Sequence, residues 1–330
     1  MTDRWLYEEG IGENRALLIE NGVAVEARIE RPVGVRVGAI ADARLVEKWQ
    51  HRDAGIAQLD DGETCLVQSL PRDISEGASV RIETVREAMV ERAGQTKRAV
   101  ARLADSKAAL SDGPDLYARI MASSRPVARV AAHGADLLEQ FGWHEIIEQA
   151  ATGRVEFPGG NLLIALTPAM TVIDVDGTLS PVALAQGAAA EVARTIRRLD
   201  LGGSIGIDFP TLATKQERTA VAASFDAAML CPCERTAVNG FGFMQIILRR
   251  ARPSLAEIIQ ADKLQSAALA LLRQAERSPG TGTLTLTVHP AIAAILARHP
   301  DWTAALAKRA GRPLQVLPDG NIGLDAGVFA

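Results

Sequence analysis

The sequence has few cysteines and no long apolar run. Only three cysteines occur in 330 residues, Cys65, Cys231 and Cys233, which excludes a disulfide-stapled fold and suits a reducing compartment. No apolar stretch approaches the roughly 20 residues of a membrane span, and the first residues lack the apolar core of a signal peptide. We therefore expect a cytoplasmic protein without a membrane span.

The chain also has little net charge and lacks several common catalytic motifs. Its formal net charge is −4, so any affinity for nucleic acid must come from local basic clusters. No GxGxxG, P-loop, HExxH or nucleophile elbow occurs. Hydrophobic residues make up 48% of the chain, enough for a substantial core in two or more subdomains.

Carboxylates accompany two short apolar strands near the middle of the chain. The β-branched run at 172–175 predicts a buried strand that carries Asp174 and ends near Asp176. An amphipathic helix follows, and then a second apolar strand at 204–209 that carries Asp208. A strand, helix and strand of this length usually form parallel neighbours, so the three carboxylates are expected at one edge of a sheet.

Three adjacent carboxylates repel one another unless a cation lies between them. Oxygen ligands without thiolate or imidazole suit Mg²⁺, with Mn²⁺ as an alternative. Such a metal would serve phosphoryl or phosphodiester transfer. The structural alternative is that each aspartate only forms a turn or caps a helix.

Two families resemble this stretch. Val-Ile-Asp174-Val-Asp176-Gly177-Thr178-Leu-Ser is similar to the first motif of haloacid-dehalogenase-type phosphatases, in which Asp174 would be the nucleophile. A domain of that family should begin near this motif and later supply a lysine and an acidic pair. Here about half of the chain precedes the motif, so we take this similarity as the weaker one.

A longer, collinear series of motifs resembles the catalytic domain of the ribonuclease E/G family. In chain order it comprises Phe157-Pro-Gly159-Gly160, Thr-Val-Ile-Asp174-Val-Asp176, Gly202-Gly203-Ser-Ile-Gly-Ile-Asp208-Phe, Asn239-Gly240-Phe-Gly242-Phe and Arg252-Pro-Ser254-Leu255. The match covers most of residues 140 to 260. A series in the same order is much more specific than any one of its motifs.

The resemblance implies an Mg²⁺-dependent endoribonuclease, a hydrolase that cuts phosphodiester bonds in single-stranded RNA during RNA processing or decay. It assigns Asp174 and Asp208 as catalytic metal ligands, and Asp176 as a third ligand or a group beside the metal. The family usually has Asn at the position of Asp176, and a longer, arginine-containing loop after Gly177. These departures leave two alternatives open: an inactive RNA-binding protein of the same fold, and a phosphatase with Asp174 as nucleophile.

The pattern of elements predicts a mixed α+β or α/β chain in four regions. Residues 1–85 form a β-rich region with a reduced OB-like barrel, and 86–155 a helical linker region that includes a basic helix over 86–109. Residues 156–260 form the nuclease-like domain, and 261–330 a small C-terminal α/β domain. Asn21-Gly22 predicts a two-residue hairpin turn.

Basic and aromatic side chains near these elements are the candidates for RNA contact. The alternatives are a solvated helix face for the cations and packing against the core for the rings. The candidate set is Arg194, Arg197, Arg198, Lys215, Arg218, Arg249, Arg250, Arg252, Phe241 and Trp49.

Two features of larger family members have no counterpart here. Those members carry a Cys-x-x-Cys zinc motif after the Pro-Ser-Leu block, whereas no cysteine follows Leu255. Cys231-Pro-Cys233 lies upstream with a one-residue spacing, and we interpret it as a packing feature. We therefore expect no zinc site and no zinc-linked tetramer, although a homodimer remains compatible. The Arg-Thr pair that senses an RNA 5′-monophosphate is also not recognisable.

Overall fold

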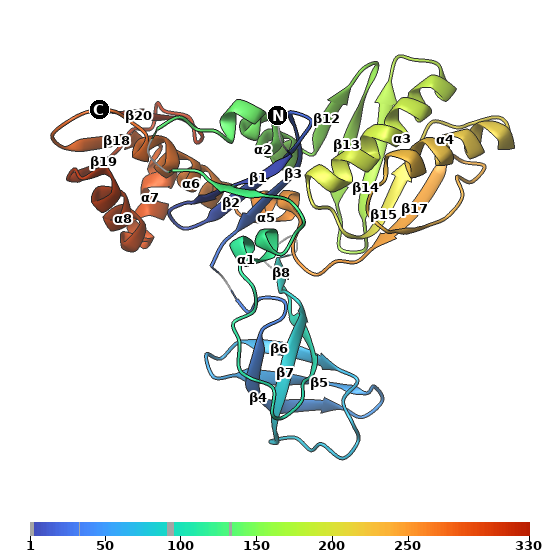
Figure 1. Ribbon diagram of the computed structural model, residues 1–330, viewed down its shortest axis with the longest axis horizontal. Coiled ribbons are helices and arrows are strands. Elements are labelled where there is room, and N and C mark those ends of the chain that lie inside the picture. Colours follow the sequence, from blue (N-terminus) through green and yellow to red (C-terminus); the bar gives the residue numbers. More distant parts are fainter. Residues whose placement is uncertain (1–2, 33, 91–95, 132–133) are drawn as a thin grey trace. The chain divides into compact units, whose positions relative to one another are not determined.

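A computed structural model describes residues 3–32, 34–90, 96–131 and 134–330, which form a mixed α+β fold (Figure 1). The chain divides into two compact units. Unit 1 comprises Met1–Pro32, Ile120–Ile147 and Asp262–Ala330, and unit 2 comprises Val33–Arg119 and Glu148–Ala261. Each unit thus combines segments that are far apart in the sequence. Among the described helices, none has the length and apolar character needed to span a bilayer.

The N-terminal sheet of unit 1 has the strand order β11-β1-β2-β3. These strands are Val127–Arg129, Arg4–Glu9, Asn14–Glu20 and Val23–Glu30. Asn21 and Gly22 join β2 to β3 with φ values of 51° and 80°, as a two-residue hairpin with positive φ at both positions requires. The predicted Asn-Gly hairpin is confirmed.

The C-terminal part of unit 1 packs helices beside a three-stranded sheet of order β19-β18-β20. Its elements are α6 (Lys263–Glu276), β18 (Leu284–Val288), α7 (Pro290–Arg298), α8 (Pro300–Ala310), β19 (Leu314–Pro318) and β20 (Gly327–Phe329). Leu269, Leu286 and Trp302 belong to its buried core, which also takes in Ile11 from the N-terminal segment. The first and last segments of unit 1 therefore share one core.

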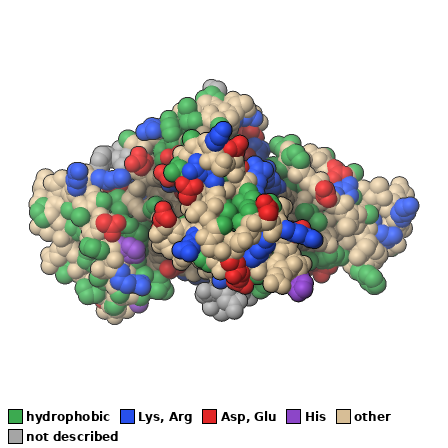
Figure 2. Space-filling model, turned by 90° about the horizontal axis from the view of Figure 1, so that it is seen from below, with side chains coloured by type: hydrophobic (Ala, Val, Ile, Leu, Met, Phe, Trp, Pro, Cys, Tyr) green, Lys and Arg blue, Asp and Glu red, His purple; other side chains and the backbone are tan. Residues whose placement is uncertain are grey.

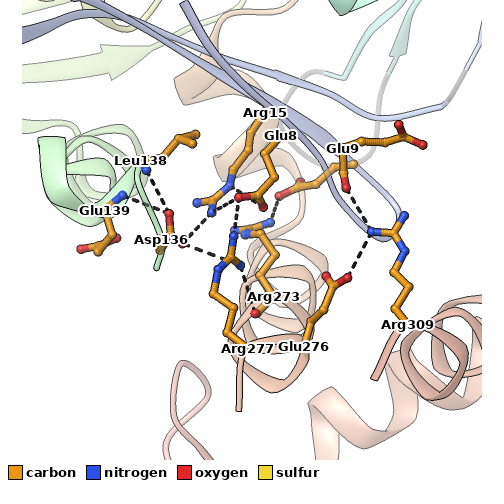
Figure 3. A network of polar contacts seen from close by, with 11 residues as sticks. Glu8, Glu9, Arg15, Asp136, Leu138, Glu139, Arg273, Glu276, Arg277 and Arg309 are labelled. Atoms are coloured by element: carbon orange, nitrogen blue, oxygen red, sulfur yellow. Dashed lines mark hydrogen bonds and ion pairs between the residues drawn. The ribbon is translucent and has the colours of Figure 1, made fainter. Parts of the chain in front are cut away.

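A buried network of charges also joins these segments (Figure 3). Arg15 Nη2 lies 2.9 Å from Glu8 Oε2 and 2.6 Å from Asp136 Oδ2. Arg277, the residue that follows α6, pairs with Glu8 as well. Burial alone would raise the pKa of Asp136, but the Arg15 guanidinium outweighs it and the pKa is lowered. The strands, the middle segment and α6 are thus held by mutually compensating charges.

Glu13 is the second centre of this network. It is buried between Arg273, with which it forms an ion pair, and Arg31, whose Nε lies 3.0 Å from Glu13 Oε2. Burial would raise the pKa of Glu13, but the charges of Arg273 and Arg31 prevail and the pKa is lowered. Glu13 is therefore ionised in the folded protein at neutral pH.

Unit 2 contains a closed five-stranded barrel in the order β10-β6-β5-β4-β7. The strands are β4 (Ile40–Trp49), β5 (Ala54–Leu59), β6 (Thr64–Gln68), β7 (Ser79–Arg86) and β10 (Ala99–Leu103). Leu45, Val67 and Ile82 fill the interior. The predicted small barrel is present, and it extends past residue 85 because β10 closes it.

The predicted basic helix over 86–109 is wrong. The described part of this segment contains the end of β7, two short strands, β8 (Met89–Val90) and β9 (Thr96–Lys97), and β10; residues 91–95 lie outside the described residues. Ala99 and Ala101 point into the barrel core. Small side chains fit this interior, so the barrel overrides the helix preference of an alanine-rich sequence. Downstream to residue 155, the helices among the described residues are α1 (Leu116–Met121), η2 (Glu139–Phe141) and α2 (Trp143–Thr152).

The second part of unit 2 is a six-stranded sheet of order β12-β13-β14-β15-β17-β16. The strands are Arg154–Phe157, Gly160–Leu166, Thr171–Gly177, Gly203–Asp208, Phe243–Leu248 and Glu234–Arg235, and the helices are α3 (Pro181–Arg198), α4 (Lys215–Ala228) and α5 (Leu255–Ala261). Strands β14 and β15 are parallel, joined by α3, as predicted. Alternate residues such as Ile173, Ile207 and Ile246 are buried on the face that α3 and α4 cover (Figure 1). The residues between them lie on the other, open face.

Candidate active site

Asp174 and Asp208 are direct cross-strand neighbours on the open face. They occupy paired positions in parallel strands β14 and β15, and adjacent strands lie about 4.8 Å apart. Asp176 is two residues further along β14 and so points to the same face. All three side chains are exposed. Asp174 and Asp208 therefore lie side by side as expected, and Asp176 shares their face one pleat further along β14.

The carboxylates influence one another electrostatically. The pKa of Asp174 is raised, first by its partial burial and then by the negative charges of Asp176 and Asp208. Mutual repulsion of this kind is relieved by a cation. The three side chains thus form a negatively charged patch at one edge of the sheet.

Asn161 completes a set of oxygen donors on this face. It pairs with Asp176 across β13 and β14, and its Oδ1 is buried without a hydrogen-bond partner within the described residues. In the described part of the chain, no three or more acidic, histidine or cysteine side chains are close enough to hold a metal together. Mg²⁺ commonly uses only one or two protein carboxylates, with water and substrate phosphate completing its shell. The donors Asp174 and Asp208 fit that mode.

An aromatic ring borders the carboxylates. Phe243 pairs with Asp208, and its ring lies over Gly206, where a Cβ atom would come within 2.5 Å of Phe243 Cζ and 3.2 Å of Met170 Sδ. Glycine at position 206 therefore lets the ring lie against the open face. Asn161 was not in the predicted set, because cross-strand register decides its place. The hairpin pairing of 161–166 with 169–175 was the available signal.

The predicted RNA-contact residues of this sheet divide between its two ends. Helix α4 starts just after Asp208, so Lys215 and Arg218 in its first turns lie at the carboxylate end. The turn with Phe241 lies there too, since Phe243 is the partner of Asp208. The C-terminal end of α3 and the residues after β17 lie at the opposite end, where Gly203 pairs with Leu248. Those far residues are Arg194, Arg197, Arg198, Arg249, Arg250 and Arg252.

Most of the arginines at the far end are engaged by carboxylates. Arg198 Nη2 lies 2.6 Å from Glu191 Oε1, and Arg194 Nη1 lies 3.2 Å from Glu191 Oε2. Arg250 pairs with Glu257, and Arg252 Nε is 3.4 Å from Glu87. Figure 2 shows the same mixture on one face of the molecule, where red and blue side chains are interspersed. These pairs reduce the positive charge that this end offers to a phosphate backbone.

The sequence comparison decides the family. The model of the ribonuclease E/G family matches residues 63–251, more than half of the chain. The chain belongs to the ribonuclease E/G family. The predicted family resemblance is thus confirmed.

Individual relatives match over shorter segments. Ribonuclease G of Escherichia coli K12 is 29% identical over 138 residues, which cover 37% of this chain and 28% of that protein. Ribonuclease E of Nostoc sp. PCC 7120 is 28% identical over 135 residues, covering 37% and 20%. Ribonuclease G of Salmonella typhimurium is 30% identical over 128 residues, covering 34% and 26%. The matched segments therefore span less than a third of each relative.

Two further predictions concern other parts of this ribonuclease E/G family member. Trp49 ends strand β4 of the barrel and is half-buried; its Nε1 donates to Glu47 Oε1 at 2.8 Å, and the Arg52 guanidinium lies 5.9 Å from the ring centroid. Cys231 is exposed and Cys233 is partly buried. Packing is therefore the wrong interpretation for Cys231.

Proposed function

We propose that the protein is a metal-dependent endoribonuclease that hydrolyses phosphodiester bonds in single-stranded RNA. The observation that carries this proposal is the pairing of Asp174 with Asp208 on the open face of the sheet, in a chain of the ribonuclease E/G family. The relatives bear the names ribonuclease G and ribonuclease E. Family membership also favours a nuclease over a phosphatase with Asp174 as nucleophile.

The residues of the open face would have three roles: metal binding, orientation of water or phosphate, and stacking on a base. Asp174 and Asp208 would hold Mg²⁺ or Mn²⁺, which when bound supplies positive charge to activate water and to neutralise the scissile phosphate. Asp176 and Asn161 flank these ligands and would orient bound water or a phosphate oxygen through hydrogen bonds. The ring of Phe243 offers a flat apolar surface for a base next to the cleaved bond.

A second candidate is an RNA-binding protein of this fold that does not cleave. The observation in its favour is the charge of Asp176, at a position where the family usually has Asn. A third carboxylate on this face adds negative charge where a phosphodiester must approach.

The two candidates differ in a cleavage experiment. A 5′-labelled single-stranded RNA of about 20 nucleotides is incubated with the protein in Mg²⁺ or in EDTA, beside Asp174→Asn and Asp208→Asn. These substitutions keep the side-chain shape and remove one charge each. We expect internal cleavage by the wild type in Mg²⁺ only, and a loss of about a hundredfold or more in each variant.

The matched control is Asp325→Asn. It removes one exposed carboxylate from the C-terminal segment of unit 1, outside the six-stranded sheet, and should leave the rate unchanged. Intact RNA that nevertheless shifts on a gel would replace the nuclease by the binding protein. A metal-dependent phosphoenzyme on Asp174 would instead support the phosphatase.

A further inference from the structure

A groove runs along helix α4 in unit 2. One wall is a single face of the helix, formed by residues three and four positions apart, and the other wall is the chain segment 235–240 that leads into β17. The cavity has a volume of about 470 Å³, within the size range of small-ligand sites. We call it the α4 groove. Its helical wall comprises Lys215, Arg218, Thr219, Ala222, Ala223 and Asp226.

The α4 groove begins at the carboxylate end of the sheet. Lys215 opens helix α4 soon after β15 ends at Asp208. The opposite wall is tied to the same point, because Phe209 N donates to Gly242 O at 3.1 Å and Asp208 pairs with Phe243. From Lys215 to Asp226 the helix axis rises about 16 Å. The groove therefore starts at the carboxylate end of the sheet and follows α4, which covers the face opposite the carboxylates, for the length of a short piece of chain.

The chemistry of the α4 groove changes along its length. Lys215 and Arg218 place two cations at the end near Asp208, where Arg218 Nη1 donates to Leu212 O at 3.0 Å. The middle is small and apolar, with Ala222 and Val238 both buried. At the far end the charges cancel, because Arg235 Nε donates to Asp226 Oδ1 at 2.6 Å. A ligand that fits this pattern is anionic near Asp208 and has flat apolar parts.

Phe241 stands beside the α4 groove and is 85% exposed. The turn that carries it is ordered: Asn239 Oδ1 accepts from Phe241 N at 2.9 Å and from Phe243 N at 3.1 Å. Gly242 has a φ of +93°, which favours glycine. The ordered turn keeps the Phe241 ring exposed to solvent beside the positively charged end of the groove. An exposed aromatic ring in such a place can stack on a nucleotide base.

We propose that the α4 groove, with Phe241 beside it, holds unpaired nucleotides of single-stranded RNA that flank the cleaved phosphodiester. The proposal rests on the proposed function for the location of the cleaved bond. Lys215 and Arg218 contact phosphates, while the apolar middle and the Phe241 ring contact bases. A duplex keeps its bases stacked and paired, so it presents no free base faces to these surfaces.

Affinity for a fluorescein-labelled ten-nucleotide RNA tests the groove apart from catalysis. Fluorescence anisotropy in EDTA gives the dissociation constant without cleavage, and the matched duplex provides the comparison. We expect wild type to bind the single strand at least tenfold more tightly than the duplex. Phe241→Ala should weaken single-strand binding about tenfold, whereas Phe241→Trp, which keeps an aromatic ring, should bind like the wild type. Ala223→Trp fills the groove and should also weaken binding about tenfold.

A pair of lysine variants tests the contribution of positive charge to RNA binding. Lys215→Ala removes an exposed lysine at the start of α4, and Lys308→Ala removes an exposed lysine from α8 in unit 1. Only Lys215→Ala should weaken binding, and it should also reduce the dependence of affinity on salt, since one phosphate contact is lost.

Photocrosslinking locates the bound RNA. A 4-thiouridine RNA irradiated on the wild-type protein and digested with trypsin should label the peptides 219–235 and 236–249, which form the two walls. Unchanged affinity in Phe241→Ala and Ala223→Trp, or crosslinks elsewhere only, would overturn the groove even where RNA is cleaved. Weakened binding in these variants of a protein that cuts no RNA would support the groove and refute the nuclease. Equal binding of duplex would also count against it.

Discussion

Asp176 places a third carboxylate on the open face, beside Asp174. Replacing it with Asn removes one negative charge beside Asp174 and the approaching phosphate. A unit charge at about 4 Å in a water-like environment is worth about 1 kcal/mol, so we expect Asp176→Asn to raise kcat/KM for single-stranded RNA about fivefold. Initial cleavage rates at saturating Mg²⁺ measure this. A lower rate would instead make Asp176 a required metal ligand.

Gly242 and Gly240 occupy the same turn but differ in backbone conformation. Gly242 has a positive φ, and a Cβ atom there would collide with the carbonyl of Phe209, whereas a Cβ atom on Gly240 would have nothing within 4 Å. We expect Gly242→Ala to lower the free energy of unfolding by about 1 to 3 kcal/mol. Gly240→Ala should change it by less than about 0.5 kcal/mol. Urea denaturation distinguishes them, and equal effects would show that the turn adapts.

The position of a single side chain can be predicted from the sequence where it depends only on a strand and the next strand along the chain. Asp174 and Asp208 end up opposite each other because a single crossover helix links their strands, and such connections make parallel pairs. Asn161 and Phe243 depend on the register of antiparallel partners. That register is set by turns and by packing that a pattern of residue types does not specify.

Helix α4 begins with a capping motif that involves only residues close together in the sequence. Thr214 and Glu217 form a capping box, with Thr214 accepting from Glu217 N and Glu217 accepting from Thr214 N. Thr214→Ala should lower the free energy of unfolding by about 1 kcal/mol, because the first turn loses a hydrogen-bond acceptor. Thr219→Ala on the same helix is the control, since its hydroxyl only donates to Lys215 O. Chemical denaturation of both variants provides the test, and equal losses would contradict the capping role.

Elements that depend on distant partners were the ones that sequence patterns missed. The segment 96–103 has the alanines and cations of a helix, yet β10 forms because β6 and β7 offer it two partners. Barrel closure is a non-local event, and intrinsic helix propensity is worth only tenths of a kcal/mol per residue. The burial of Ala99 and Ala101 in the barrel core therefore outweighs the helix propensity of this segment.

Glu13 tests the charge network of unit 1 as a whole. Glu13→Gln leaves Arg273 without its buried carboxylate and should cost about 3 kcal/mol of unfolding free energy at pH 7. Because the folded pKa of Glu13 is lowered, its stabilisation is present above the unfolded value of about 4.3 and is lost as pH falls below it. The difference between wild type and variant should therefore shrink towards pH 3.

Urea titrations at pH 7, 5 and 3 measure that difference. Asp325→Asn, which removes an exposed carboxylate from the same unit, should have little effect at any pH. A constant gap between wild type and Glu13→Gln across this range would show that packing, and not ionisation of Glu13, explains the loss.

Sequence patterns also did not predict the division into two units, because this division depends on contacts between distant segments. Unit 1 brings three segments together through contacts such as Arg15 with Asp136 and Glu13 with Arg273. Periodicity describes each segment by itself, and it carries no information on which distant segments share a core.

The pairing of Glu13 with Arg273 spans 260 positions of the chain. A ribosome adds roughly 5 to 20 residues per second, so Arg273 is made about 13 to 50 s after Glu13. All of unit 2 is synthesised during that interval. Unit 2 can thus fold before α6 is available to the N-terminal strands, and Glu13 gains Arg273 as its partner only after that helix has left the ribosome.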